Sequence, residues 1–244
     1  MNAEFDHFAA WLATPLGRYV ALSEAAWFER AAVDLFGYKA IQLELPQIDC
    51  LRSNRMPWRL QAGEAAGTQL KCTAHELPFD EQSLDLIALP HVLDFSPDPH
   101  AVLRECQRVL RPEARLLITG FNPWSLWGLR RLKPNQDMPW KGNFVALPKL
   151  KDWLIELDLQ AVYDEHLCYR PPIQRAGWLE KSRFFDQAGD RLWPAGGGVY
   201  CLEVVKRVRG MHVIEPQWRT VTVNQNAAVA VEKMRQQAGK DRCK

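Results

Sequence analysis

The sequence predicts an α/β fold with a mostly parallel sheet, helices on both faces and an antiparallel last strand. Short apolar segments alternate along the chain with segments of helical period, which implies crossover connections between parallel strands. Residues 84–90 form a continuous apolar run of the kind that is buried on both faces of a sheet. The glycine-rich turn 195–198 precedes the last apolar segment, and a hairpin-like reversal there makes the last strand antiparallel.

The individual elements follow from periodicity and from helix-end signals. Residues 5–36 predict helices, because Phe5, Phe8 and Leu12 recur at helical spacing and Gly37 is a typical helix stop. Asp98-Pro99 predicts the start of a helix that runs through Leu110, and a further helix is expected over 148–158. A brief helix is expected within 47–55. Strands are expected near 39–44, 57–61, 69–73, 84–90, 115–120, 159–168 and 199–206.

Length and composition are those of an ordinary globular protein. The chain has 244 residues, of which 47% are hydrophobic and 25% charged, enough for one large α/β domain. We predict a single domain over 1–224, with N-terminal helices at 5–36 and a core at 37–206. Residues 225–244 are expected to form a basic, mobile or weakly helical tail. The formal net charge of +2 neither demands nor excludes nucleic acid.

Cysteine and histidine spacing give no sign of a metal site. The six cysteines include no Cys-x-x-Cys pair, and the scattered histidines lack ligand spacing, so we predict no metal. The first residues carry acids and no uninterrupted apolar run, which is unlike a signal peptide. No segment approaches the ~20 apolar residues that span a bilayer. We therefore expect a soluble, cytoplasmic protein.

Several linked motifs lie in register between residues 72 and 122. They include Leu77-Pro78-Phe79, then an apolar strand, then Leu103-Arg104-Glu105 on a helix and Leu110-Arg111-Pro112 before the next strand. This block closely resembles the central part of class I S-adenosylmethionine-dependent methyltransferases, in particular the small-molecule branch called type 11. The resemblance implies a Rossmann-like sheet and S-adenosylmethionine as the cofactor.

The resemblance also implies where the site lies, since ligands of open parallel sheets bind beyond the carboxyl ends of the strands. In relatives, the segment that matches 42–47 cradles the methionine part of the cofactor, 73–76 faces adenine and 90–93 lies near the sulfonium. His91 is the candidate catalytic residue, as a general base or substrate contact; the alternative is a structural histidine at a strand end. The candidate cofactor-binding residues are Gln42, Glu44, Thr73, Ala74, Pro90 and His91.

The cofactor loop departs from the family pattern. Relatives carry an acidic residue followed by Gly-x-Gly-x-Gly, whose glycines allow a sharp turn and close approach of the ligand. Here Gln42 replaces the acid, and Glu44, Pro46 and Ile48 replace the glycines. Thr73 stands where relatives often place an aspartate that faces adenine. Cofactor binding would therefore need altered contacts, and we expect Glu44 to repel the cofactor's carboxylate.

Residues 121–133 are expected to form a helix that covers the pocket. Asn122, Trp124 and Trp127 are the candidate substrate-binding residues, because the segment follows a strand that ends at the ligand crevice. Trp124 and Trp127 are three apart and are expected on one face. The alternatives are an amphipathic helix packed on the core and, with less support because Pro134 shortens the apolar face, a membrane-surface helix.

Two functions remain open at this point. The first is an S-adenosylmethionine-dependent methyltransferase acting on a small apolar or aromatic molecule. The second is a catalytically silent methyltransferase-like protein with a binding or regulatory role, which the altered loop favours. Nucleic acid is not expected as a substrate, because Asn122-Pro123-Trp124 only half resembles the Asn/Asp-Pro-Pro-Tyr/Phe tetrad of nucleic-acid methyltransferases.

Overall fold

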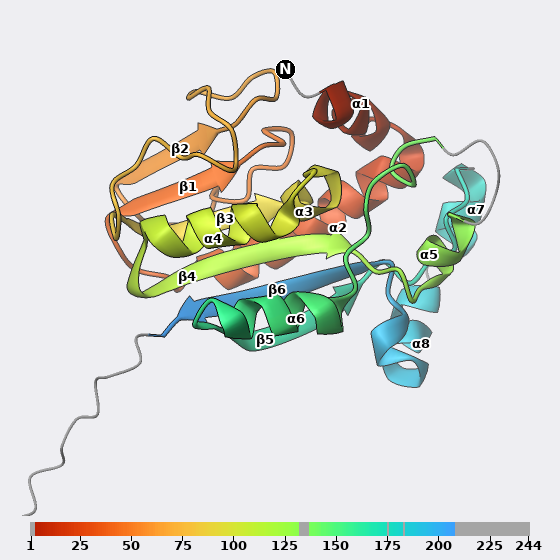
Figure 1. Cartoon of the computed structure of the whole chain (residues 1–244). Coiled ribbons are helices and arrows are strands. Elements are labelled where there is room, and N and C mark those ends of the chain that lie inside the picture. The colour runs from red at the N-terminus through yellow and green to blue at the C-terminus, as the bar shows by residue number, and fades with distance from the viewer. Residues whose placement is uncertain (1–2, 132–136, 175, 183, 208–244) are drawn as a thin grey trace, which may run out of the picture. The chain divides into compact units, whose positions relative to one another are not determined.

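Six strands form one sheet in the order β2-β1-β3-β4-β6-β5 (Figure 1). In this computed structural model the described residues are 3–131, 137–174, 176–182 and 184–207. The predicted tail at 225–244 lies outside them. β1 to β4 are parallel neighbours, whereas β6 runs antiparallel to both β4 and β5. The strands are β1 Lys39–Leu43, β2 Trp58–Ala62, β3 Leu84–Pro90, β4 Leu110–Phe121, β5 Leu159–Leu167 and β6 Val199–Lys206.

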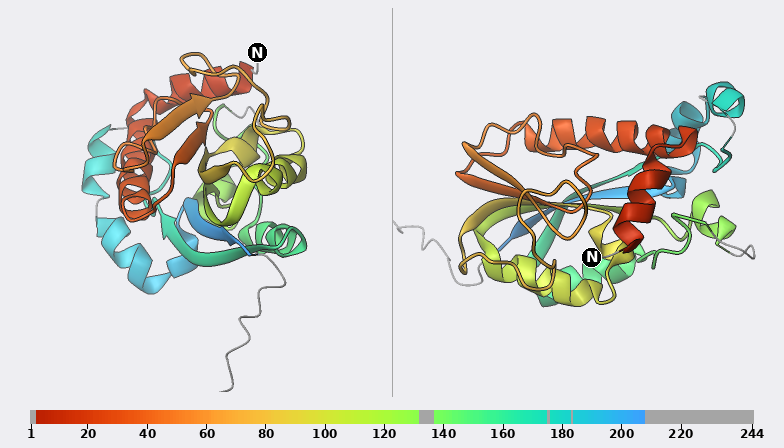
Figure 2. Two further views of the ribbon diagram at one scale, coloured as in Figure 1. Left: turned by 90° about the vertical axis from the view of Figure 1, so that its left-hand side faces the viewer. Right: turned by 90° about the horizontal axis from the view of Figure 1, so that it is seen from above.

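Helices cover both faces of this sheet, as predicted. Figure 2 shows α2 on one face and α4 and α6 on the other. The Rossmann-like architecture and the antiparallel last strand are thus confirmed. The helices are α1 Ala3–Leu12, α2 Pro15–Ala32, α3 Val92–Phe95, α4 Pro99–Val109, α5 Leu126–Arg130, α6 Leu147–Glu156, α7 Ala176–Lys181 and α8 Phe184–Leu192, with a 3₁₀ turn at Pro194–Gly196.

The helix starts follow the sequence signals. The Thr14 side chain accepts a hydrogen bond from the Gly17 N–H at the start of α2, and the Asp98 side chain accepts one from the Ala101 N–H at the start of α4. In each helix a proline occupies the first position, where its missing N–H has no intrahelical acceptor to lose. Below the α4 cap, the buried face consists of Val102, Leu103, Cys106 and Val109, which anchors this helix to the sheet.

Three local predictions were wrong. Residues 47–55 contain turns instead of a helix, and 69–73 contribute only isolated bridges, from Leu70 to Ala62 and from Thr73 to Glu76. Only six residues separate β2 from Gln69, whereas a crossover to a full parallel strand needs a dozen or more. The glycine turn at 196–198 does not join two strands, because α7, α8 and the 3₁₀ turn lie between β5 and β6.

Candidate cofactor and active site

The loop after β1 is closed by its own side chains. The buried Gln42 amide donates to the carbonyl oxygens of Leu45 and Ile48, at 2.9 and 2.7 Å, and accepts from the Cys50 N–H at 3.0 Å. The side chains of Leu45 and Ile48, which belong to this loop, are themselves buried. Gln42 therefore holds together the segment that the resemblance assigns to the methionine part of the cofactor.

The Glu44 side chain occupies the space between the loop after β1 and the loop after β2. Its carboxylate accepts hydrogen bonds from the N–H groups of Glu64 and Ala65, both at 2.8 Å, in the loop after β2. Burial raises the pKa of the Glu44 carboxyl, although the two N–H groups act in the opposite direction. A Cβ atom on Gly63 would lie 2.5 Å from Glu44 Cδ, so the side chain is tightly enclosed.

The loop keeps a glycine-like backbone although it contains no glycine. Glu44 and Leu45 have φ values of 58° and 45°, in the left-handed region that most side chains avoid. Such a conformation costs about 1 kcal/mol or more at each residue. The hydrogen bonds of the Gln42 amide and the Glu44 carboxylate offset this strain.

A hollow of about 420 Å³ lies beside this loop and is lined by Glu64, Lys71, Cys72 and Thr73. The Lys71 ammonium donates to the carbonyl oxygens of Glu64 and Ala65, which holds that wall in place. Thr73 is exposed and the neighbouring Ala74 is half-buried. Thr73 therefore lines a surface hollow, whereas the predicted cofactor residues Gln42 and Glu44 are buried.

A buried carboxylate–imidazole–carboxylate cluster lies at the carboxyl end of β3. His91 Nδ1 is 2.8 Å from Asp94 Oδ2, and His91 Nε2 is 2.7 Å from Glu24 Oε1 on α2. The three side chains are fully buried, and the Phe121 N–H donates to Asp94 Oδ2 at 2.9 Å. Pro90, also buried, ends β3 just before His91.

The charge of this cluster follows from its two carboxylates. Burial acts to lower the pKa of His91, but Glu24 and Asp94 outweigh it and raise the pKa to about 9. For the Asp94 carboxyl, burial has the opposite effect and raises the pKa. The imidazole is therefore protonated at neutral pH, and as it stands it is an acid or a positive centre instead of a free base.

Several polar atoms around His91 are buried without a hydrogen-bond partner among the described residues. They are Glu24 Oε2, Asp94 Oδ1, Thr119 Oγ1 and the Tyr200 hydroxyl. A buried polar atom without a partner costs free energy, so a group of them at one place calls for a functional explanation.

Aromatic side chains seal the cluster from solvent. The His91 ring stacks on Phe121 with centroids 4.2 Å apart, and Phe8 of α1 meets it edge-on at 5.1 Å. Trp11 of α1 stacks in turn on Phe8 at 5.4 Å. Access to His91 would require α1 to move, because Phe8 and Trp11 are part of its cover.

The segment after β4 differs from its predicted geometry. Trp124 lies before α5, is 72% exposed and lines a surface hollow of about 530 Å³, whereas Trp127 is buried in the core. The expectation that both rings project from one helix face was wrong, because the helix is short and starts only at Leu126. The Asn122 side chain donates to the carbonyls of Ala195 and Gly197, so it ties β4 to the turn before β6.

Glu24, Phe8 and Trp11 belong to the site although the sequence interpretation did not assign them to it. Glu24 could have been found from its spacing, because it interrupts a row of buried apolar residues four apart on α2, namely Leu16, Val20 and Phe28. A charged side chain in such a row is buried and needs a partner. Among the described residues, no group of three His, Cys, Asp or Glu side chains is arranged to hold a metal ion.

Comparisons with known proteins relate part of the sequence and the whole fold to methyltransferases. Residues 40–118 match the family model of a type 11 methyltransferase domain. The fold matches a "possible histamine N-methyltransferase" from Thermotoga maritima with a TM-score of 0.63 and 16% identity, over 85% of this chain and 100% of that one. It also matches an S-adenosylmethionine-dependent methyltransferase from Archaeoglobus fulgidus, with a TM-score of 0.52 and 15% identity over 75% and 92% of the two chains.

The predicted resemblance is thereby confirmed. Residues 40–118 match the model of a methyltransferase-domain family, and the chain has the fold of solved S-adenosylmethionine-dependent methyltransferases. A curated relative, the uncharacterized protein YafS of Escherichia coli K12, is 37% identical over 113 residues, which are 46% of this chain and 47% of the relative. The match thus spans about half the length of that relative.

Proposed function

We propose that this protein is an S-adenosylmethionine-dependent methyltransferase that acts on a small apolar or aromatic molecule. The observation that carries the proposal is the cluster of Glu24, His91 and Asp94 at the carboxyl end of β3, with unpartnered polar atoms around it. In an open parallel sheet this is the edge at which ligands bind. The aromatic rings that cover His91 would contact a flat apolar substrate once α1 has moved.

The loop after β1 does not fit the methionine end of the cofactor in the conformation described. The Glu44 carboxylate occupies the N–H groups of Glu64 and Ala65, and Gln42 fills the turn. We therefore derive no catalytic step through the cofactor. The residues themselves can hold a proton between one imidazole and two carboxylates, and His91 remains the candidate catalytic residue.

A catalytically silent, ligand-binding protein is the second candidate, and the same loop favours it. Gln42 and Glu44 stabilise a closed turn, and His91 is completely buried. In this alternative the methyltransferase fold persists while the glycine loop has become part of the core.

Calorimetric titration with S-adenosylhomocysteine separates the two functions. We expect weak binding to the wild type and tighter binding to Glu44→Gly, which removes the carboxylate and relieves the positive φ. Glu44→Gln is the matched variant: tightening in both variants indicates charge repulsion, and tightening in Glu44→Gly alone indicates bulk. Circular dichroism checks that each variant is folded. If no protein gives heat at millimolar ligand, the silent function is the correct one.

A further inference from the structure

Exposed large apolar side chains gather at one end of the molecule. Figures 1 and 2 show α5, α7 and α8 at the same end, beyond the carboxyl end of β4. Trp124 is 72% exposed, Phe184 60% and Leu129 58%. We define the apolar end by the exposed large apolar side chains of α5, α7 and α8 and of the residues that flank α5 and α8: Trp124, Leu126, Leu129, Trp178, Phe184 and Trp193.

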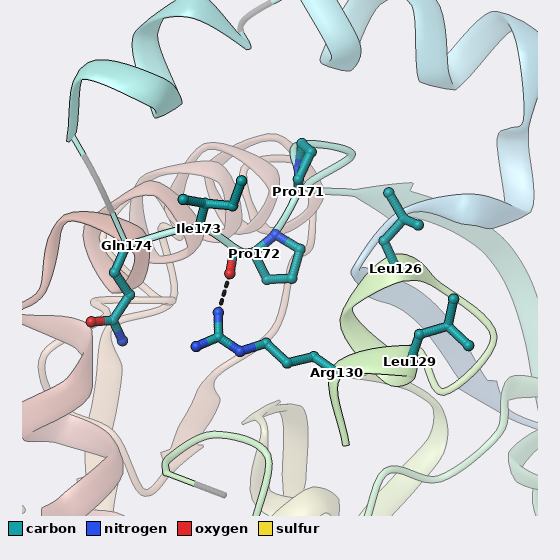
Figure 3. Close-up of a pocket in the computed structure, with 7 residues that line it drawn as sticks. All are labelled: Leu126, Leu129, Arg130, Pro171, Pro172, Ile173 and Gln174. Carbon is teal, nitrogen blue, oxygen red and sulfur yellow. Dashed lines mark hydrogen bonds between the residues drawn. The ribbon is translucent and has the colours of Figure 1, made fainter. Parts of the chain in front are cut away.

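This end is hollowed by a groove of about 590 Å³ (Figure 3). Leu126 and Leu129 of α5 form one wall, and residues 171–173 form the other. The Arg130 guanidinium crosses the groove floor, donates to the Pro172 carbonyl and stacks over the Trp140 ring at 3.9 Å. Because its guanidinium is engaged in this way, Arg130 braces the two walls.

The surrounding segments are basic. Residues 121–131 and 170–193 together contain seven arginines and lysines and three acids, although Arg175 and Arg183 lie outside the described residues and Arg130 and Arg170 are engaged within the protein. Lys181 and Arg191 are exposed, and they lie on the same two helices as Trp178 and Phe184. Exposed tryptophans beside exposed cations such as these two complement the surface of a lipid bilayer, which is anionic at the headgroups and apolar beneath them.

We propose that the apolar end docks on the surface of an anionic lipid bilayer. Its aromatic and leucine side chains would enter the interface while the basic side chains meet the lipid phosphates. None of the described helices could span a bilayer. The contact that we propose is with the lipid interface. A short apolar face after β4 was the reason to expect no membrane contact. The exposed aromatic side chains of α7 and α8 add to the apolar side chains of α5. This docking does not depend on whether S-adenosylmethionine binds.

Vesicle flotation with the full chain tests the proposal. We expect the protein to float with vesicles of phosphatidylglycerol and phosphatidylcholine, to stay unbound with phosphatidylcholine alone, and to detach as salt is raised. The double variant Trp178→Ser/Phe184→Ser should weaken flotation about tenfold, because it removes two side chains that enter the interface. The matched control is Leu22→Ser/Phe36→Ser, since these side chains are 72% and 79% exposed and do not belong to the apolar end as defined.

Three outcomes would overturn the proposal. The first is no flotation with anionic vesicles, and the second is equal loss in the control variant. The third is equal binding to neutral vesicles without salt dependence, which would contradict the role of charge. The alternative occupant of the apolar end is a second copy of this chain, which sedimentation velocity would detect as a dimer. A wild-type dimer that Trp178→Ser/Phe184→Ser dissociates would assign the apolar end to that second copy instead.

Discussion

Replacing Glu24 by glutamine should alter how the stability of the protein depends on pH. Glu24 is fully buried, and its Oε1 lies 2.7 Å from His91 Nε2. Glutamine keeps the size of the side chain but removes the charge, so the buried imidazolium loses one of its two carboxylates. Removing one partner of a buried ion pair typically costs about 3 to 5 kcal/mol. We expect the free energy of unfolding of Glu24→Gln at pH 6 to fall by an amount in that range.

The pH dependence follows from the pKa of His91. Its folded-state pKa of about 9 is above the ordinary value of 6.5, so protonation stabilises the folded protein. That contribution is complete below pH 6.5 and is lost as the pH rises towards 9. A pKa difference of this size corresponds to about 3 kcal/mol. In Glu24→Gln the pKa of His91 should fall, because Glu24 is the largest influence that raises it, and the loss between pH 6.5 and 9 should shrink.

Urea unfolding at pH 6, 7.5 and 9 measures both effects. Glu29→Gln is the matched control, because Glu29 lies on the same helix and is exposed. The difference between the Glu24→Gln and wild-type curves isolates His91 from the other titrating groups. Parallel stability curves for the two proteins from pH 6 to 9 would refute the view that Glu24 holds the proton on His91.

Four further substitutions test the packing of the site by thermal or urea unfolding. Gln42→Ala should destabilise the protein by about 2 kcal/mol or more, since it strips hydrogen bonds from a buried loop; a loss below 0.5 kcal/mol would contradict this. Trp127→Ala should cost about 3–5 kcal/mol, whereas Trp124→Ala should stay within about 1 kcal/mol; equal losses would show that exposure is not the deciding difference. Gly63→Ala should displace the Glu44 carboxylate, and unchanged stability would mean that the loop tolerates the added methyl group.

The loop after β1 and the buried His91 are both inaccessible to a ligand in this conformation. Ligand access at either place requires a local rearrangement: Glu44 must leave the N–H groups of residues 64 and 65, or α1 must lift Phe8 from His91. Each movement exchanges buried hydrogen bonds or apolar contacts for ligand contacts, so measured affinities will include that cost.

Local sequence signals predict the main strands, one helix start and the family resemblance. Continuous apolar runs predicted β3 and β4, Asp98-Pro99 predicted the start of α4, and the motifs between 72 and 122 predicted the family. These signals are local, because hydrophobic period and helix capping depend on residues only a few positions apart. The placing of His91 at the carboxyl end of β3 follows from the same signals.

The surroundings of these residues depend on tertiary packing and could not be predicted from the sequence. Glu24 and His91 are 67 positions apart, and Glu44 meets an N–H group 20 positions away, so no local pattern pairs them. Burial of Trp127 and exposure of Trp124 likewise depend on how the chain packs after β4. Sequence spacing predicts which side of an element a residue occupies, but the neighbours that cover that side come from other strands and helices. Whether a charge is paired or a ring is exposed is therefore settled by the sheet order and the helix packing.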